Sequence, residues 1–183
     1  MMKANSLTCN GQRSALFRLL APVVVATSIC LSGAAQSAPQ VHLDANGLAP
    51  RPIEELTATT ITRHYGLAWN ELALALESNR SNRLSEEFVG TAKDRLARRV
   101  VEQSRSGIHV RIVDHGHQLR AVFYSTDGTV MQLVDRAQLE IQTFDGSRLL
   151  DATSSPHDYL VLMTPGADRW YVRNLEEISV TSF

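Results

Sequence analysis

Cysteine is nearly absent from this 183-residue chain, and its two copies, Cys9 and Cys30, both lie in the first 30 positions. Small exported domains often depend on disulfides because their apolar cores are thin. Residues 31–183 contain neither a disulfide framework nor a cysteine nucleophile. Burial of apolar side chains must therefore hold this part of the chain together.

The sequence also lacks the signatures of phosphate binding, serine hydrolysis and membrane spanning. Its glycines are scattered at turns, so there is no glycine-rich phosphate loop, and no Gly-x-Ser-x-Gly elbow occurs. The apolar run Leu19–Leu31 spans 13 residues and is interrupted by Pro22. Because a membrane-spanning helix needs about 20 apolar residues, this run favours a different interpretation.

Residues 1–37 show the order of segments that is typical of a secretory signal peptide: basic residues, an apolar run and then small residues. The only charged residues in this stretch are basic: Lys3, Arg13 and Arg18. The apolar run follows them, and small residues then allow cleavage after Ala35 or after Ser37. Cleavage predicts an exported protein, either periplasmic or secreted.

Two alternatives to cleavage involve the membrane. In one, an uncleaved segment from Ala15 to Ala35 serves as an anchor, and only then would the protein contact a membrane. In the other, Cys30 carries a lipid. The residue before a lipidated bacterial cysteine is normally small, and Ile29 is not, so cleavage is the preferred prediction.

The charge of the remaining chain excludes one class of partner. Without the leader, 146–148 residues remain, with 15 basic and 19 acidic side chains and a net charge of −4 when histidine is neutral. Non-specific nucleic-acid binding needs a basic face, so no nucleic-acid partner is predicted. The arginines at 95, 98, 99 and 105 alternate with acids and are interpreted as a solvated helix face.

Apolar spacing divides the rest into two helices followed by strands. Residues 38–52 hold three prolines and no periodicity, which predicts a flexible lead-in to a single domain over 53–183. Helical spacing predicts helices over Ile53–Leu76 and Ser85–Ser104, with Ser85 as the N-cap of the second. From Ile108 onward, apolar residues recur at every second position. This alternation predicts strands over Ile108–Val113, Gln118–Ser125, Val130–Phe144, Tyr159–Thr164 and Arg169–Leu175.

The connections between these strands are predicted from turn-forming residues. Asp114 to His117 is interpreted as a hairpin turn, and Asp151 to His157 as a loop or a frayed strand. Helices first and strands afterwards indicate an α+β fold, with two N-terminal helices packed on a curved antiparallel sheet of four to six strands.

Several segments resemble the nuclear-transport-factor-2-like superfamily, also called SnoaL-like or cystatin-like α+β cones. They are the helix TRHYGLAWNELALAL, the second helix ending at a glycine, the Asp-Gly turns and the closing strand RWYVRNLEEI. The resemblance covers about residues 53–178 and concerns shape. It implies a cone whose mouth carries an Asp, His or Tyr in catalytic members, whereas transport factors, secretion-system domains and organelle-division scaffolds have no catalysis.

Asp135 is the best candidate for chemistry. Alternation along its strand places it with Leu133 and Ala137 on one apolar face, where burial would raise its pKa and suit a general base. The alternatives are a bulge that reverses this parity, or an ion pair with Arg120.

His64 and Tyr65 lie on or beside the stripe of the first helix and could face the same cavity. The alternative is a hydrogen-bonded histidine at the core edge and a buried tyrosine. A ligand pocket would be lined by Trp69, Tyr65 and Leu133, although these side chains could equally fill the core.

Metal-type ligands gather only at the segment Asp114-His115-Gly116-His117. His115 and His117, two apart on an extended chain, would point the same way, with His109, His157 or Asp158 as additional ligands. No third ligand stands at a diagnostic spacing, so no metal site and no cofactor are predicted.

Three functions remain open at this point. The first is an exported, non-catalytic domain that binds a protein partner or a small apolar ligand in its cone; its open sheet face would also suit a homodimer. The second is a cofactor-free enzyme for proton transfer, isomerisation, dehydration or hydrolysis that uses Asp135. The third is a membrane-tethered domain of an envelope assembly. Of these, the sequence favours the first, because no acid–base constellation stands out.

Overall fold

The computed structural model describes residues 39–179. The predicted leader, 1–37, lies outside these residues, as do the last four positions of the predicted domain. The elements in chain order are β1 (Val41–Asp44), α1 (Glu55–Ser78), the 3-10 helix η1 (Ser81–Ser85), α2 (Gly90–Arg105), β2 (Ile108–Tyr124), β3 (Met131–Asp145), β4 (Arg148–Pro165) and β5 (Trp170–Ile178).

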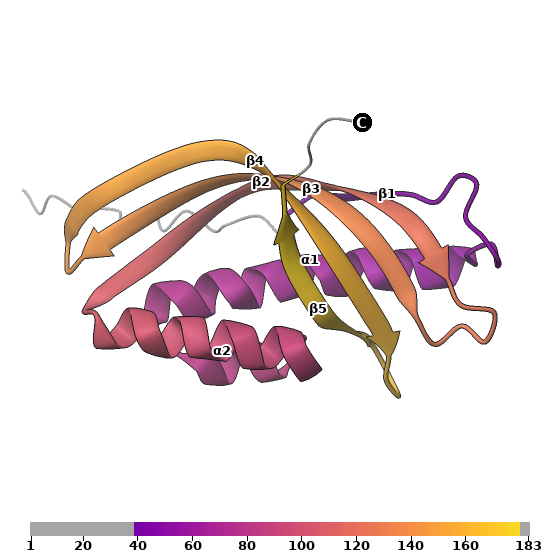
Figure 1. Cartoon of the computed structure of the whole chain (residues 1–183), viewed down its shortest axis with the longest axis horizontal. Helices are drawn as coiled ribbons and strands as arrows, with labels where there is room; N and C mark the ends of the chain where they lie inside the picture. Colours follow the sequence, from indigo (N-terminus) through magenta and orange to yellow (C-terminus); the bar gives the residue numbers. More distant parts are fainter. Residues whose placement is uncertain (1–38, 180–183) are drawn as a thin grey trace, which may run out of the picture. The chain divides into compact units, whose positions relative to one another are not determined.

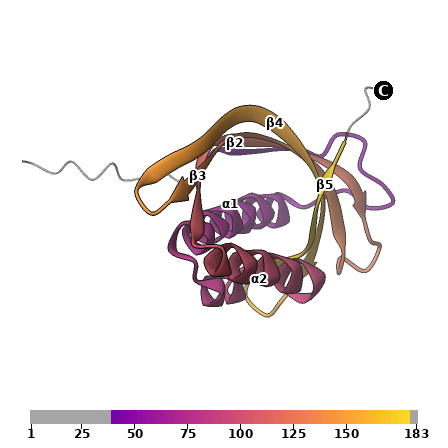
Figure 2. The same cartoon turned by 60° about the vertical axis from the view of Figure 1, so that its left-hand side comes forward.

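The strands form one sheet in the order β1-β2-β3-β4-β5. Figure 1 shows this sheet arching over α1 and α2, and Figure 2 shows the two helices within its concave side. The α+β class is confirmed, with two helices and five strands. The prediction of a purely antiparallel sheet is wrong, because β1 pairs with β2 in parallel. The helices are also not N-terminal, since β1 precedes them.

Strand β1 lies inside the segment that the sequence predicts to be flexible. Val41 and Leu43 are half-buried and pack against the core, while His42 and Asp44 are exposed. The Gln40 carbonyl also accepts a hydrogen bond from the His117 amide at 2.9 Å. Four residues are too few for alternation to stand out between prolines, so the prediction of a flexible lead-in is wrong here for a local reason.

Helix α1 places one apolar face against the sheet. Its buried residues are Ile61, Tyr65, Gly66, Ala68, Trp69, Leu72, Ala75 and Leu76. The helix ends where Asn79 adopts a left-handed conformation (φ 56°) and its amide bonds to the Ala75 carbonyl. Within residues 39–179, neither α-helix combines the length and apolar character needed to cross a membrane.

Helix α2 begins later than the sequence predicts, and Ser85 is not its N-cap. The chain first runs beside β5, where the Val89 amide bonds to the Val172 carbonyl and the Val172 amide to the Glu87 carbonyl, at 3.0 and 2.9 Å. These two bonds hold the backbone extended, so the helix begins only at Gly90. The serine instead ends the 3-10 helix.

The long strands also differ from the prediction. The expected turn at Asp114 to His117 is a bulge within the continuous strand β2, where the pairing with β3 shifts by one residue. For Asp151 to His157 the sequence allows a loop or a frayed strand, and the strand is observed: the segment belongs to β4 and pairs with β3. This part of β4 is largely exposed, so it carries a polar sequence that resembles a loop.

Candidate functional site

Asp135 lies on the concave face of the sheet, in the middle of β3. Its side chain is fully buried, and its neighbours Leu133 and Ala137 on the same face are also buried. The register of β3 is unbroken around it, so no bulge reverses the parity. Arg120 is exposed and is not its partner. The predicted inward orientation of Asp135 is therefore confirmed, while the partner is a different residue.

The partners of Asp135 are Tyr65 from α1 and His117 from β2. Its Oδ2 atom accepts a hydrogen bond from the Tyr65 hydroxyl at 2.7 Å and another from His117 Nδ1 at 2.8 Å. The second ring nitrogen of His117, Nε2, lies 2.9 Å from Asp114 Oδ2. The four side chains form one chain of hydrogen bonds, which we call the buried network.

His117 is the cation of this network. Both of its ring nitrogens face carboxylate oxygens, which accept hydrogen bonds and do not donate them, so both nitrogens carry protons. Burial lowers the pKa of His117, but the hydrogen bonds to Asp114 and Asp135 and the charges of these carboxylates outweigh it and raise the pKa to about 9. The imidazolium is thus the stable form at neutral pH.

The β2 bulge brings His117 into the core. Gly116 has φ 124°, and its amide donates to Asp114 Oδ1 at 2.8 Å. The extra residue reverses the alternation of the strand, so His117 is fully buried while the side chain of His115 is 52% exposed. The expectation that the two histidines point the same way is therefore wrong. Among the residues that the structure describes, no metal-binding group of His, Cys, Asp and Glu is found.

Tyr65 is the neutral hydrogen-bond donor at the end of the buried network opposite Asp114. Burial raises the pKa of its hydroxyl well above the usual value, and the nearby Asp135 charge raises it further. The other oxygen of Asp135, Oδ1, is buried and has no hydrogen-bond partner within residues 39–179. Each remaining polar side-chain atom of the network bonds to another member of the network, except Asp114 Oδ1, which accepts a hydrogen bond from the Gly116 amide.

Trp69 separates the buried network from a cavity. Its ring lies against His117 with centroids 4.8 Å apart, and against Tyr159 with centroids 5.2 Å apart. The cavity has a volume of about 340 Å³ and is bounded by α1, α2 and the concave face of the sheet. Trp69 lines it, whereas Tyr65, Leu133, Asp135 and His117 do not.

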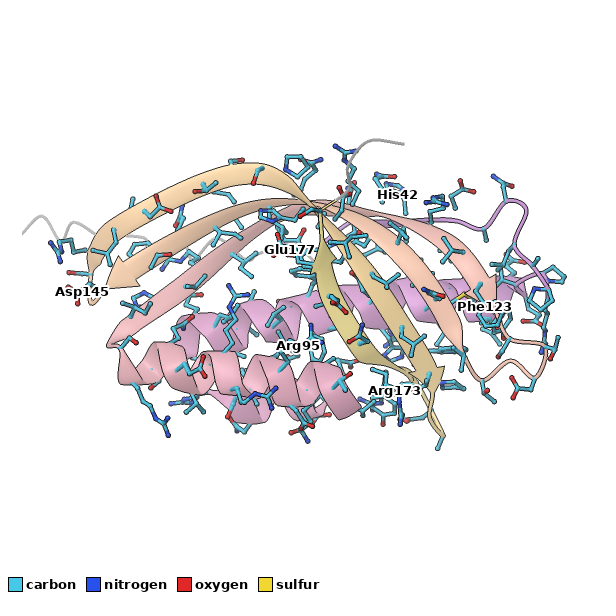
Figure 3. The ribbon with its side chains drawn as sticks, viewed as in Figure 1. His42, Arg95, Phe123, Asp145, Arg173 and Glu177 are labelled. Atoms are coloured by element: carbon cyan, nitrogen blue, oxygen red, sulfur yellow. The ribbon has the colours of Figure 1, made fainter. Side chains whose placement is uncertain are left out.

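The cavity wall is apolar and its rim is charged. The apolar lining consists of Trp69, Leu72, Leu76, Leu96, Val110, Ile112, Leu139, Ile141 and Leu175. The polar lining consists of Arg95, Arg99, Tyr159, Glu176 and Glu177. Arg95 comes from α2 and Glu177 from β5 (Figure 3), so charges of opposite sign reach the rim from different elements.

The predicted site residue His64 belongs to a separate cluster. Its Nδ1 lies 3.0 Å from Glu87 Oε2, and Arg169 approaches the other oxygen of Glu87 at 3.6 Å. Glu87 is 4% exposed, so this cluster ties α1 to the segment before α2 and to Arg169, the residue before β5. The structure thus brings Tyr65 and Asp135 together, and it places His64 elsewhere.

Sequence reasoning missed the roles of His117 and of the α2 arginines. His117 was assigned to a turn because Asp-His-Gly-His is rich in turn residues, and a glycine inside an alternating strand was the available signal of a bulge. Arg95 and Arg99 were interpreted as a solvated face. Only the docking of α2 against the sheet shows that they border an apolar cavity.

Comparisons with known proteins indicate a fold for this chain but do not identify a family. No family model matches the chain, and no curated protein matches it. The intermembrane space region of the chloroplast protein ARC6 is similar, with a TM-score of 0.61 at 14% identity, over 70% of this chain and 99% of that one. At this identity the likeness shows the fold alone.

Two lower-scoring structures carry the NTF2-like or dehydratase description. A putative dehydratase of the NTF2-like family from Streptomyces avermitilis has a TM-score of 0.45 at 12% identity, over 68% of this chain and 98% of that one. A putative scytalone dehydratase from Novosphingobium aromaticivorans has a TM-score of 0.46 at 10% identity, over 66% and 86%. Both likenesses have TM-scores below 0.5 and add nothing to the fold that the ARC6 region shows.

Proposed function

We propose that this chain is a non-catalytic binding domain that takes a small, largely apolar ligand into the cavity between its helices and its sheet. The observation that carries the proposal is the position of Trp69, which lines the cavity on one side and covers His117 on the other. A ligand in the cavity would meet apolar side chains and a polar rim. It would not meet the buried network.

The buried network supports catalysis poorly. A general base must come within hydrogen-bond reach of the proton that it removes. Asp135, His117 and Tyr65 are fully buried, bond to one another and do not line the cavity. The enzyme alternative pairs Asp135 with His64 or Tyr65. His64 bonds to Glu87 instead, and the Tyr65 hydroxyl is buried and already donates to Asp135.

The size and chemistry of the cavity support a small-molecule ligand. Pockets for small molecules have volumes of about 300–1,000 Å³, with mostly apolar walls and a few polar groups. The cavity of about 340 Å³ fits this description at its lower end. If each water-sized group occupies roughly 30 Å³, the cavity holds a chain of roughly eleven such groups.

The binding proposal is tested by titrating the protein with 1-octanol in a calorimeter. Val110 lines the cavity, and Val113 lies on the opposite face of the same strand, β2. Val110→Phe should fill the cavity and weaken octanol binding at least about tenfold, which corresponds to about 1.4 kcal/mol. The matched control Val113→Phe should bind octanol like the unchanged protein. Equal binding by both variants, or no binding by the unchanged protein, would refute the proposal.

We further propose that the domain works outside the cytoplasm. The basic, apolar and small-residue order of 1–37 supports cleavage and export, and the similar ARC6 region is named for an intermembrane space. The mass and the N-terminus of the protein from fractionated cells test this. A soluble species that starts near Gln36 or Ala38 supports export. A full-length species in the membrane fraction would instead make the leader an anchor and favour the tethered alternative.

A further inference from the structure

The rim of the cavity carries two cations on one element. Arg95 and Arg99 are four residues apart on α2, so they lie on the same face of the helix. Both line the cavity and are exposed. Arg95 Nη2 lies 3.5 Å from the side-chain oxygen of Asn174. Among the ion pairs between described residues, none includes either arginine.

The facing rim carries the carboxylate of Glu177 on β5. Glu177 pairs in register with Tyr159 of β4, on the concave face, whereas Glu176, which also borders the cavity, pairs with Leu160 and alternates to the opposite face. His157 Nδ1 lies 2.8 Å from a carboxylate oxygen of Glu177. No salt bridge joins these glutamates to the arginines of α2 within residues 39–179.

Tyr159 lies near charged groups from both sides of the rim. Burial raises the pKa of its hydroxyl, the negative charge of Glu177 raises it further, and the positive charge of Arg99 lowers it. Its ring borders the cavity next to Trp69. A ligand head group at this level would therefore lie near the Arg99 guanidinium, the Glu177 carboxylate and the Tyr159 ring.

Resting on the proposed function, we propose that the ligand is an amphiphile with a zwitterionic head group. Its apolar chain lies against Leu72, Leu139 and Ile141, and its anionic group faces the guanidinium groups of Arg95 and Arg99. Its ammonium group faces Glu177 and the ring of Tyr159. Cations bind over aromatic rings and beside carboxylates, while guanidinium groups bind anionic oxygens.

Charge complementarity favours a zwitterion over a head group of one sign. A purely anionic head would meet Glu177, and a purely cationic head would meet the two arginines, so each is repelled from one side of the rim. A head with both charges meets an opposite charge on each side. The two sides are formed by different elements, α2 and β5, which lets one head group contact both.

The first experiment compares four ligands that share a decyl chain, each titrated by calorimetry below its micelle-forming concentration. They are decyldimethylammonio-propanesulfonate, decyl sulfate, decyltrimethylammonium and 1-decanol. The zwitterion should bind most tightly, and 0.5 M salt should weaken it toward decanol, since exposed charges are screened. Decyl sulfate or decyltrimethylammonium binding as tightly as the zwitterion would refute the proposal.

The second experiment tests the arginine side and the glutamate side of the rim separately. An exposed charge pair changes affinity by about two- to fivefold, so Arg99→Gln and Glu177→Gln should each weaken the zwitterion by this factor and leave decanol unchanged. Arg98→Gln is the matched control, because Arg98 lies beside Arg99 but does not line the cavity. Equal effects of Arg98→Gln and Arg99→Gln would refute the head-group assignment.

The outcomes separate this inference from the proposed function. If decanol binds and Val110→Phe blocks it, but the zwitterion gains nothing over decanol, only the head-group inference fails. If no decyl ligand binds, the cavity is not a ligand site and both fail. Vesicles of phosphatidylcholine distinguish the source of the head group: co-sedimentation that Arg99→Gln weakens supports a membrane lipid, and binding of the dispersed zwitterion alone supports a soluble amphiphile.

Discussion

The two sides of Trp69 differ in what they contain and in what can reach them. On one side, the buried network joins four polar side chains, of which Tyr65, His117 and Asp135 are fully buried and Asp114 is 16% exposed. On the other side, the cavity of about 340 Å³ is apolar and open at a charged rim. The acid–base groups of Tyr65, His117 and Asp135 are thus sealed, and the accessible cavity has apolar walls.

This difference argues that polar burial and ligand binding serve separate purposes in this domain. A buried ion pair that loses one partner destabilises a protein strongly, because the remaining charge is left without compensation. The network should therefore control the stability and shape of the sheet, while the cavity should control what binds. Three perturbations test this division, in addition to the tests given above for the binding proposals.

The largest effect is expected from Asp135→Asn. This change removes the buried counter-charge of His117 and should lower the free energy of unfolding by about 3–5 kcal/mol, measured by urea denaturation. The control is Asp145→Asn, an exposed carboxylate that bonds to Arg148 and should cost less than about 1 kcal/mol. A variant at 135 that keeps its stability but loses ligand binding would break the division between the two sides.

The pH dependence of stability should be the next largest effect. The pKa of His117 is about 9 in the folded protein and about 6.5 in an unfolded chain. The contribution of His117 to the free energy of unfolding is therefore complete below pH 6.5. It is lost as the pH rises from 6.5 to about 9, which lowers this free energy by up to about 3 kcal/mol.

Urea midpoints measured across this range test the pH prediction. His117→Gln should remove most of the slope, although it also lowers the overall stability. The affinity for octanol should stay constant over the same range while the protein remains folded, because His117 does not line the cavity. A steep change in octanol affinity near pH 9 would instead show that the two sides are coupled.

The smallest effect is expected from Gly116→Ala, at the bulge that turns His117 inward. Its φ of 124° is unfavourable for residues with a side chain, and an added Cβ would lie 3.2 Å from the Gln40 carbonyl oxygen. The cost should be about 1–3 kcal/mol, with faster amide exchange in β1. Gly146→Ala is the control: it also has positive φ but meets no atom within 4 Å and should cost about 1 kcal/mol. Equal costs would show that β1 is not held by the bulge.

Local patterns in the sequence were sufficient for the existence of both α-helices and for the orientation of Asp135, but not for the start of α2. The stripe of α1 predicted that Tyr65 and Trp69 would be buried, and alternation along β3 placed Asp135 inward; both are observed. These features depend on residues that are neighbours in one element, so periodicity can detect them.

The remaining features depend on contacts between distant elements. The extra residue at the bulge, His115, has no partner in β3 and reverses the alternation of β2, so the inward position of His117 could not be read from spacing alone. The cavity is formed by side chains from α1, α2 and four strands, and its rim charges resemble an ordinary solvated surface in the sequence. The exposed part of β4 has polar residues on both faces and therefore no alternation to detect.

The parallel pairing of β1 has a consequence for the order of events during synthesis. Residues 41–44 pair only with residues 117–120, so the earliest described strand to leave the ribosome has no partner until more than seventy further residues have followed it. Pairing across such a long loop is slow, because the entropy of closing the loop must be lost before any contact forms. The strand that begins the described fold therefore has to wait for β2, and the edge of β2 that it covers stays open until the two strands pair.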